Sequence, residues 1–541
     1  MPIERSKEKD YKPLPGLSKA SGQVTGGQSS LKPSGVANDA TTAEPQNLVN
    51  LSYNYAAEPE SRGTPVNAEV GSSADSGSPA TTISESVSNP SEAIPRSPKA
   101  EKKVKSDKKD RELLGRDRWL VRNGHLATYI ALYLFSIMVL FRPYEIIPGL
   151  EFLGFTAFYL GIATLALFFP NQFAAEGNLT MFSTEVKAVL ALTVLALFTI
   201  PIAKDPVLAG DIFKDTFVKA VIIFIVLVNV VRTRKRLMNI IWLSFGVGIY
   251  LGVSAVQLYM EGKFSVEEYR VAVTETKGMF GNPNEMALHF VMMTPLALTL
   301  GIASKSLTMR VVYFSLTALF VAANMLTDSR GGFLGLVFSS MVLAWKLGRK
   351  YRFNVTIASI LIGAIGIIAA PGNYGMRVLS IFIPVLDGVG SSDQRKALLE
   401  RSLLVTARNP WGIGIGNFPL VGFHDLQTHN AFTQVSAEIG ILGLVAYLVF
   451  MISPFRKLGA IERALFAKDE TNWFYYLSIG FQASICGYLV SSFFASVAYN
   501  WFIYYLIAYA VAFRRIYSLE NGITEEVKTK SLWERHPAEA V

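Results

Sequence analysis

The sequence predicts an all-α, polytopic membrane protein with about twelve transmembrane helices, preceded by a disordered N-terminal arm. Apolar residues make up 51% of the 541-residue chain and charged residues only 17%, whereas soluble domains carry about 25% charged residues. All 35 Phe and all 7 Trp follow residue 110, while 11 of the 24 Pro precede it. The composition therefore argues against an ordinary soluble enzyme and divides the chain into a polar arm and an apolar body.

Residues 1–110 are expected to form a disordered cytoplasmic arm. The segment 1–98 is rich in small and polar residues and contains only three aromatic residues, so it cannot bury enough apolar surface to offset its conformational entropy. A charge-rich run over 99–122 directly precedes the first apolar segment, where it would lie near anionic lipid on the cytoplasmic face. The net charge of +9 could also indicate an arm that binds nucleic acid, but this is the weaker alternative. Nucleic acid is not an expected partner.

Twelve segments are candidates for crossing a bilayer, which takes about 20 mostly apolar residues. Together they predict a multi-spanning membrane domain over 111–515, followed by a cytoplasmic tail over 516–541. The segments are 125–141, 151–170, 185–203, 216–232, 237–259, 286–304, 310–328, 331–348, 353–371, 430–454, 473–495 and 499–514.

Lys and Arg in the short loops indicate the direction of these spans, because such loops are retained in the cytoplasm. With the arm in the cytoplasm, every basic cluster in a short loop falls on the same side, and so do both termini. The long segment 372–429 then lies outside, and it is the expected functional element because loops of this length are uncommon as connectors. Within it, 393–408 has the pattern of an amphipathic helix. The basic clusters are Arg232 to Arg236, Lys305 to Arg310, Lys346 to Arg352, Arg456 to Lys468 and the tail from Arg514.

Four polar motifs fall on the outer side of this topology, and each also has a structural interpretation. Arg330 could snorkel to the interface, and Asn282 could cap a helix that begins at Pro283. His429 is the best single candidate for chemistry, because it lies where the long loop meets a helix and its ordinary pKa suits proton abstraction near neutral pH. Glu438 is interpreted as a buried hydrogen-bond or ion partner. The motifs are Lys277 to Glu285 with Asn282 and Asn284, Thr327 to Gly332 with Arg330 and Gly331, Arg395 to Asn417 with Arg401 and Gly414, and Thr428 to Gly443 with His429, Asn430 and Glu438.

Taken together, the motifs resemble the O-antigen ligase/polymerase family of bacterial envelope glycosyltransferases. The family pattern His-Asn-(x)7-Glu-x-Gly-x-x-Gly is matched from His429 to Gly443, and its Ser-Arg-Gly is matched by Ser329 to Gly331. Two further stretches fit in the same order: Gly278 to Asn284, and Asn409 to Gly416. The resemblance covers roughly 125–515 and implies a GT-C-like membrane fold in the bacterial cytoplasmic membrane.

The resemblance implies that a glycan is moved from an undecaprenyl-diphosphate carrier to an acceptor hydroxyl on the extracytoplasmic face. The acceptor would be lipid A-core, another glycan or a protein hydroxyl, so ligase, repeat-unit polymerase and protein O-oligosaccharyltransferase all stay open. A flippase or exporter of lipid-linked glycan is the non-enzymatic alternative. The implied reaction is an inverting displacement in which His429 takes the acceptor proton.

Cations rather than a metal are expected to neutralise the diphosphate leaving group, and no cofactor is expected. The outer loops contain no Asp-x-Asp motif, and their one adjacent carboxylate pair, Glu267-Glu268, lies outside the motifs. Guanidinium groups suit phosphate oxygens, so Arg330 is assigned to the reaction beside His429. Glu438, Asn430, Gly331 and Gly414 are expected to give structural support. The residues expected to bind diphosphate or glycan are Arg270, Lys277, Asn282, Asn284, Arg395 and Arg401.

Overall fold

The computed structural model confirms an all-helical architecture: the described residues form helices and no strand. The chain divides into Met1–Ala93 and Ile94–Val541, and all described residues belong to the second unit. The arm 1–110, Lys277, most of the ninth predicted span and most of the tail lie outside the described residues. The structure describes 125–147, 149–176, 178–264, 270–273, 281–349, 374–379, 391–423 and 425–521, together with Phe353 and Ile357.

Six helices of the described chain are long and apolar enough to cross a membrane, which supports a membrane protein. Each falls on a predicted span, and α9 is the most enclosed of them, with 83% of its apolar window buried inside the protein. The six are Glu151–Phe173 (the 3-10 helix η2, Glu151–Phe155, with most of α4, Thr156–Glu176), α8 (Arg234–Met260), α9 (Pro283–Ala303), α10 (Leu307–Leu326), α16 (Ile441–Ala467) and Trp473–Phe494 (α17, Trp473–Ser491, with η6, Ser492–Phe494).

Five further helices coincide with predicted spans but are shorter or contain basic residues. The last of them, α18, continues to Glu520 and so passes the predicted end of the membrane domain at 515. The five are α2 (Leu126–Ser136) with its π-helical extension η1 (Ile137–Phe141), α5 (Thr184–Thr199), α7 (Val218–Val230), α11 (Arg330–Leu347) and α18 (Trp501–Glu520).

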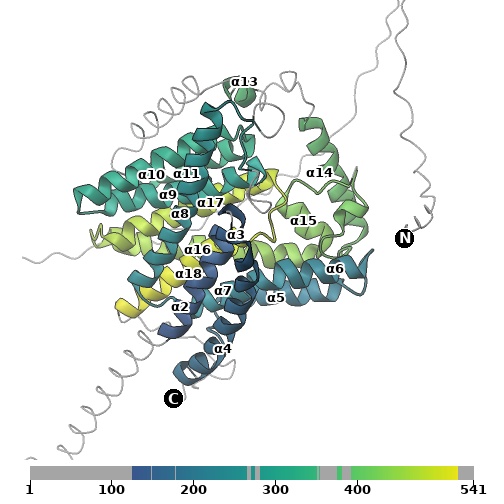
Figure 1. Cartoon of the computed structure of the whole chain (residues 1–541), viewed down its shortest axis with the longest axis horizontal. Helices are drawn as coiled ribbons and strands as arrows, with labels where there is room; N and C mark the ends of the chain where they lie inside the picture. Colours follow the sequence, from purple (N-terminus) through teal and green to yellow (C-terminus); the bar gives the residue numbers. More distant parts are fainter. Residues whose placement is uncertain are drawn as a thin grey trace, which may run out of the picture. The chain divides into compact units, whose positions relative to one another are not determined.

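The described chain also contains several shorter helices. The predicted amphipathic helix at 393–408 is confirmed as α14, and it packs on α15. In Figure 1, α6, α14 and α15 lie together at the right-hand end of the view. This end carries the loops that hold the polar motifs. The short elements are α3 (Pro143–Ile146), α6 (Pro206–Ile212), η3 (Phe213–Phe217), α13 (Tyr374–Leu379), α14 (Ser391–Arg408), η5 (Phe418–Leu420) and α15 (Ala431–Glu438).

The predicted tenth span, 430–454, is not one continuous helix. It is divided into α15 and α16 at Gly440, whose φ is +90°. The peptide N–H of Ile441 donates to the carbonyl of Pro410 (2.9 Å), and a Cβ at Gly440 would lie 2.5 Å from that same oxygen. A turn of the long loop at Pro410 therefore lies where a straight helix would run, and only glycine fits at position 440.

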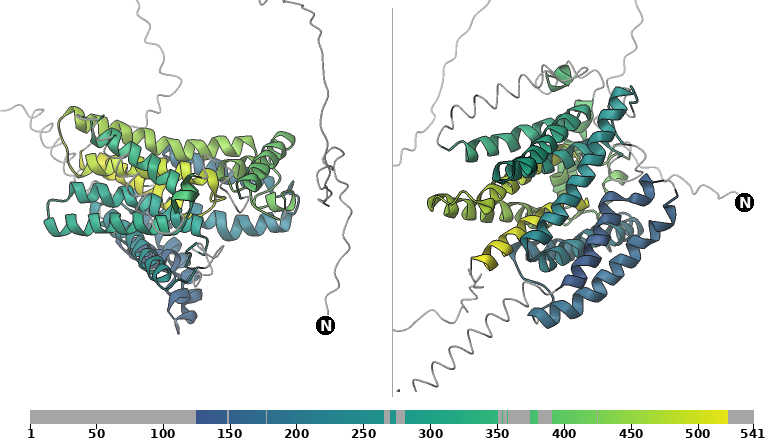
Figure 2. Two further views of the ribbon diagram at one scale, coloured as in Figure 1. Left: turned by 90° about the horizontal axis from the view of Figure 1, so that it is seen from above. Right: turned by 60° about the vertical axis from the view of Figure 1, so that its left-hand side comes forward.

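Close helix packing surrounds α11. Helix α11 packs against both α9 and α17, and Figure 2 shows the teal helices α9–α11 running beside the yellow-green helices α16–α18. A Cβ at Gly335 of α11 would lie 2.9 Å from the carbonyl oxygen of Gly487 in α17. Glycine at both positions lets the two backbones approach, as in other membrane helix pairs. The start of α11, at Arg330, is held rigidly as a result.

Candidate functional site

The Asn-Pro-Asn and Ser-Arg-Gly motifs are joined by one side chain. The Oδ1 atom of Asn284 accepts hydrogen bonds from the guanidinium of Arg270 (2.9 Å) and from the hydroxyl of Ser329 (2.9 Å). Arg270 is 5% exposed and also donates through Nε to the carbonyl of Thr327 (3.1 Å). Arg270 therefore connects the loop before α9 to the loop before α11, although the sequence suggested it as a ligand of the diphosphate.

Both motifs also begin a helix, which explains why they meet. Asn282 is the N-cap of α9, with Pro283 in the first turn, as its structural interpretation predicted. Ser329 is the N-cap of α11, and its Oγ accepts the peptide N–H of Gly332 (3.2 Å). Asn and Ser are favoured caps because their side chains satisfy N–H groups that the first helical turn leaves open. The caps bring the starts of two neighbouring helices to the same end of the protein.

Arg330 is the first residue of α11 and is half-buried. The two glycines after it lie against neighbouring helices: a Cβ at Gly331 would be 3.0 Å from that of Phe494, and one at Gly332 would be 2.7 Å from that of Ala287. Because Gly331 and Gly332 leave no room for a side chain, the neighbouring helices fix the backbone that follows Arg330.

His429 lies immediately before α15, in the left-handed backbone region with φ +51°. Its peptide N–H donates to the hydroxyl of Ser496 (2.8 Å), while its half-buried imidazole makes no hydrogen bond with a described residue. The following Asn430 caps α15 by accepting the N–H groups of Phe432 (2.9 Å) and Thr433 (3.1 Å). The backbone is thus held from both sides, and the ring is left available for chemistry.

The electrostatics favour a neutral imidazole at His429. Burial lowers its pKa below the ordinary value, and the positive charge of Arg395 on α14 lowers the pKa further. A histidine that is neutral at physiological pH can accept a proton. Arg395, which the sequence analysis expected to bind diphosphate or glycan, therefore lies close enough to His429 to act on its charge.

Arg401 lies on the same helix as Arg395 but is already engaged by the loop that follows. Its Nε donates to the carbonyl of Val421 (2.8 Å), and its guanidinium carbon lies 5.9 Å from the ring centroid of Phe423. Both arginines are half-buried. Arg401 therefore orders the segment leading to His429.

The glycine-rich stretch after Asn409 passes between α15 and the loop joining α5 and α6. Gly412, Gly414 and Gly416 all have positive φ, and a Cβ at Gly414 would lie 2.3 Å from that of Ala203. The peptide N–H of Gly414 donates to the carbonyl of Glu438 (3.0 Å). These glycines are required by backbone conformation and close approach, which gives Gly414 a structural function.

Glu438 is fully buried where α15 ends. Its carboxyl group accepts the peptide N–H of Phe418 (3.4 Å), and the peptide of Gly416 and the hydroxyl of Tyr499 also lie against it. Burial raises the pKa of Glu438 to about 7. Its contacts connect the glycine-rich stretch, the end of α15 and the segment before α18.

That segment, 494–500, contacts three of the four motifs and was not singled out by the sequence. Phe494 packs on Gly331, Ser496 holds the backbone of His429, and Tyr499 lies against Glu438. Asn500 lies against the side chain of Glu285 at the start of α9. No short-range pattern marks these residues, since each acts through a contact distant in sequence. We call 494–500 the hub segment.

Among the described residues, no group of three or more His, Cys, Asp or Glu side chains could hold a metal ion. The polar groups of the motifs are instead one imidazole, guanidinium groups and amides, and among these Arg395 acts on His429. Such a set can bind an anion and accept a proton.

The helices and this site together define an integral membrane protein with a polar, partly buried His and Arg site at one end. Residues 315–448 match the family model described as O-antigen ligase. The family resemblance seen in the sequence is thereby confirmed. No curated protein matches the chain.

The matched segment contains Arg330, Arg395, Arg401, His429 and Glu438. The Asn-Pro-Asn motif and the hub segment lie outside the match and are joined to it only by contacts in the fold. Members of the family are glycan-transferring ligases and polymerases.

Proposed function

We propose that the protein transfers a glycan from an undecaprenyl-diphosphate carrier to an acceptor hydroxyl, outside the bacterial cytoplasmic membrane. The observation that carries this proposal is that the hub segment contacts both the Ser-Arg-Gly motif, through Phe494, and His429, through Ser496. These two contacts support a site in which the imidazole of His429 and the guanidinium of Arg330 act on the same substrates. The acceptor class covers hydroxyls of lipid A-core, of another glycan or of a protein.

The reaction is a single displacement at the anomeric carbon. The acceptor oxygen attacks that carbon as its proton passes to the imidazole of His429. The bond from carbon to the carrier oxygen breaks, and the electron pair leaves with the diphosphate. One displacement inverts the anomeric centre. His429 suits this role because its lowered pKa keeps it unprotonated near pH 7.

Cations stabilise the charge that develops on the departing diphosphate. Arg330, Arg395 and Lys277 are assigned to its oxygens, because guanidinium and ammonium groups are strong donors to phosphate. Arg270, Arg401 and the two asparagines act mainly as positioning residues, since their contacts hold the loops around the site. The mechanism uses no metal, so activity should persist in EDTA, and loss restored by Mg²⁺ or Mn²⁺ would contradict it.

The proposal includes a GT-C-like arrangement of about twelve spans with both termini in the cytoplasm. A reporter fused after Arg349 should then be cytoplasmic, and one fused after Asn409 should be extracytoplasmic. A cytoplasmic signal at Asn409 would overturn the assignment of the site to the outer face.

The test of function uses purified protein in vesicles with an undecaprenyl-diphosphate glycan as donor. His429→Ala should reduce transfer by about 10²–10⁴-fold and leave donor binding unchanged, because the imidazole acts on the acceptor. Arg330→Lys should weaken donor binding as well as turnover, because the charge remains but the two-pronged contact is lost. Normal turnover in well-folded His429→Ala would refute the assigned base.

A further inference from the structure

A second polar region lies at the other end of α16 from His429. A groove of about 790 Å³ runs along this helix and is closed at its sides by Thr184 of α5, Lys346 of α11 and Gln482 of α17. Pockets that hold small ligands measure about 300–1,000 Å³. Its farthest lining residue on α16, Arg463, lies 22 residues after Ile441, which corresponds to roughly 30 Å of helix. The end of the groove at Arg463 is therefore distant from the proposed transfer site.

One face of α16 supplies both an apolar and a basic part of this groove. Val445, Val449 and Ile452 line the half nearer the outer site, and Arg456 and Arg463 line the other half. With Ala460 included, successive members of this series are three or four residues apart, so these side chains form one stripe on the helix. An apolar stripe that ends in arginines matches the acyl chain and headgroup of a lipid.

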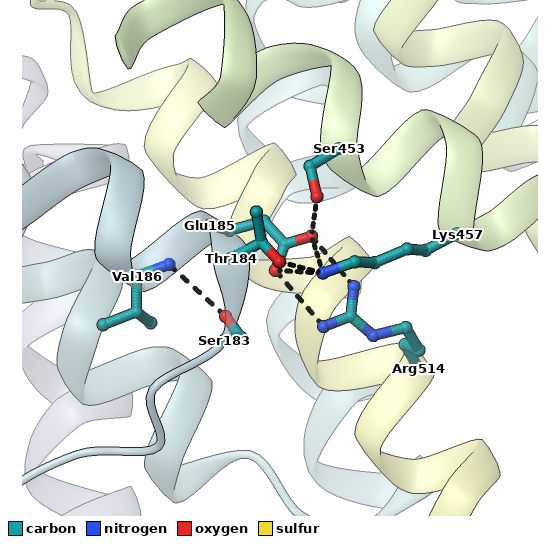
Figure 3. A network of polar contacts seen from close by, with 7 residues as sticks. All are labelled: Ser183, Thr184, Glu185, Val186, Ser453, Lys457 and Arg514. Carbon is teal, nitrogen blue, oxygen red and sulfur yellow. Dashed lines mark hydrogen bonds and ion pairs between the residues drawn. The ribbon is translucent and has the colours of Figure 1, made fainter. Parts of the chain in front are cut away.

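Four cations line the groove, and two of them also contact buried carboxylates. Lys457 lies 3.1 Å from Glu185, and Lys346 lies 2.7 Å from Glu462. Figure 3 shows Lys457 reaching the carboxylate of Glu185 beside Arg514, which lies 2.9 Å from the same group. Arg349 similarly contacts Glu462. Each carboxylate therefore has two cations, so the pairs leave positive charge in excess.

The remaining two cations increase that excess. Arg456 and Arg463 are exposed, and neither forms an ion pair with a described residue. The positive charge of Arg463 also repels the ammonium group of Lys346. Repulsion among these groups is relieved when an anion enters the groove.

A buried acceptor in the groove wall narrows the chemistry of that anion. Gln482 is fully buried, and its Nε2 donates to the carbonyl of Ser478 (3.0 Å), while its Oε1 receives no hydrogen bond from a described residue. An amide oxygen needs a donor, which a bare phosphate diester does not offer. A hydroxyl on the headgroup supplies this donor, and the hydrogen bond removes the energetic cost of a buried, unpaired acceptor.

We propose that this groove binds an anionic phospholipid with a hydroxylated headgroup, such as a phosphatidylglycerol. The phosphate lies between Arg456 and Arg463, a headgroup hydroxyl donates to Gln482, and one acyl chain follows Val445, Val449 and Ile452. Basic pockets between transmembrane helices bind anionic headgroups in this way. The site is independent of the proposed transfer reaction.

The experiment measures lipid retention by native mass spectrometry of the full chain, in detergent mixed with phosphatidylglycerol or phosphatidylcholine. The wild-type protein should retain phosphatidylglycerol and lose phosphatidylcholine. The double variant Arg456→Gln/Arg463→Gln should bind phosphatidylglycerol about 10- to 30-fold more weakly, since each basic residue near an anionic headgroup contributes about a fivefold factor. The matched control Lys235→Gln/Lys305→Gln, which removes two exposed lysines outside the groove, should bind as the wild type does.

Two further comparisons separate the proposed lipid from other sources of the same chemistry. Soluble glycerol 3-phosphate should not displace phosphatidylglycerol at equal concentration, because it has no acyl chain. Val449→Trp should fill the apolar half of the groove and weaken binding, whereas Leu442→Trp, exposed on the same helix but outside the groove, should not. Equal loss in the lysine control, equal retention of both lipids, or full displacement by glycerol 3-phosphate would each overturn the proposal.

Discussion

Two buried carboxylates on either side of the membrane domain are held in different ways. Glu185 of α5 faces Arg514 of α18 at 2.9 Å and Lys457 of α16 at 3.1 Å, and it also accepts the hydroxyl proton of Ser453 (Figure 3). Glu438 has no cation among its described contacts; it accepts the peptide N–H of Phe418, and the peptide of Gly416 and the hydroxyl of Tyr499 lie against it. Both side chains are fully buried.

The two buried carboxyl groups therefore have different structural functions. The pair at Glu185 connects three long helices, so its charges hold the bundle together. The neutral donors at Glu438 belong mostly to loop backbone, so this carboxyl group orders the loops that surround His429. Charge therefore stabilises the helical body, and hydrogen bonds with little net charge shape the site.

The largest expected effect follows from breaking the ion pair at Glu185. Arg514→Gln leaves a buried carboxylate with only the more exposed Lys457, and removal of one partner of a buried pair costs about 3–5 kcal/mol. We expect a large drop in thermal stability in detergent. Lys457→Gln should cost less, and Glu185→Gln/Arg514→Gln should recover part of the loss. A melting temperature unchanged by Arg514→Gln would show that the pair does not hold these helices.

Replacing Glu438 should have a smaller effect on stability, and this effect should depend on pH. Burial raises the pKa of Glu438 to about 7, so the folded protein keeps a proton that the unfolded chain releases above its ordinary value of 4.5. Stability should therefore fall as the pH rises from about 5 to 8. Glu438→Gln stays neutral and should flatten this part of the pH profile of the melting temperature. A profile identical to that of the wild type would mean that Glu438 is ionised in the fold.

This contrast also explains which features the sequence could predict. Apolar runs identified the helices because membrane spans depend on local composition, and the O-antigen ligase resemblance was visible because its motifs are contiguous. Caps at Asn282 and Ser329 follow from local hydrogen bonding. The break at Gly440 was missed because its cause, Pro410, belongs to another segment.

Long-range pairs were equally invisible to the sequence. Arg514 and Glu185 are 329 residues apart, and a run of basic residues at a helix end predicts topology without naming a partner. The hub segment carries no motif of its own. It acts through packing and single hydrogen bonds from residues such as Phe494 and Ser496.

A third prediction concerns the charge next to the candidate base. Arg395 lowers the pKa of His429, and burial is the larger cause of the same shift. Because the base must be neutral, transfer should rise with pH through a pKa below 6.5. Arg395→Gln should move this acid limb upward, so the ratio of rates at pH 8 and pH 6 should increase a few-fold, while Lys396→Gln, exposed on the same helix, should leave the ratio unchanged. An acid limb that does not move in Arg395→Gln would show that the charge of Arg395 does not affect the pKa of His429.

The smallest expected effect lies in the hub segment, at Ser496. Its hydroxyl accepts the peptide N–H of His429 at 2.8 Å and lies 3.1 Å from the hydroxyl of Thr428, so it holds the backbone of the base without touching its ring. One such hydrogen bond contributes about 0.5–1.5 kcal/mol. If the loss falls on the transition state, Ser496→Ala should lower kcat by about 2- to 10-fold. Donor KM and the acid limb of the pH profile should stay constant, since neither the diphosphate contacts nor the charge near His429 change. Ser496→Thr keeps the hydroxyl and should restore the rate. Ser492→Ala removes a hydroxyl that bonds only to Leu489 of the preceding turn and should have no effect on kcat. A full rate in Ser496→Ala would show that the positive-φ conformation of His429 is held by Asn430 and α15 alone.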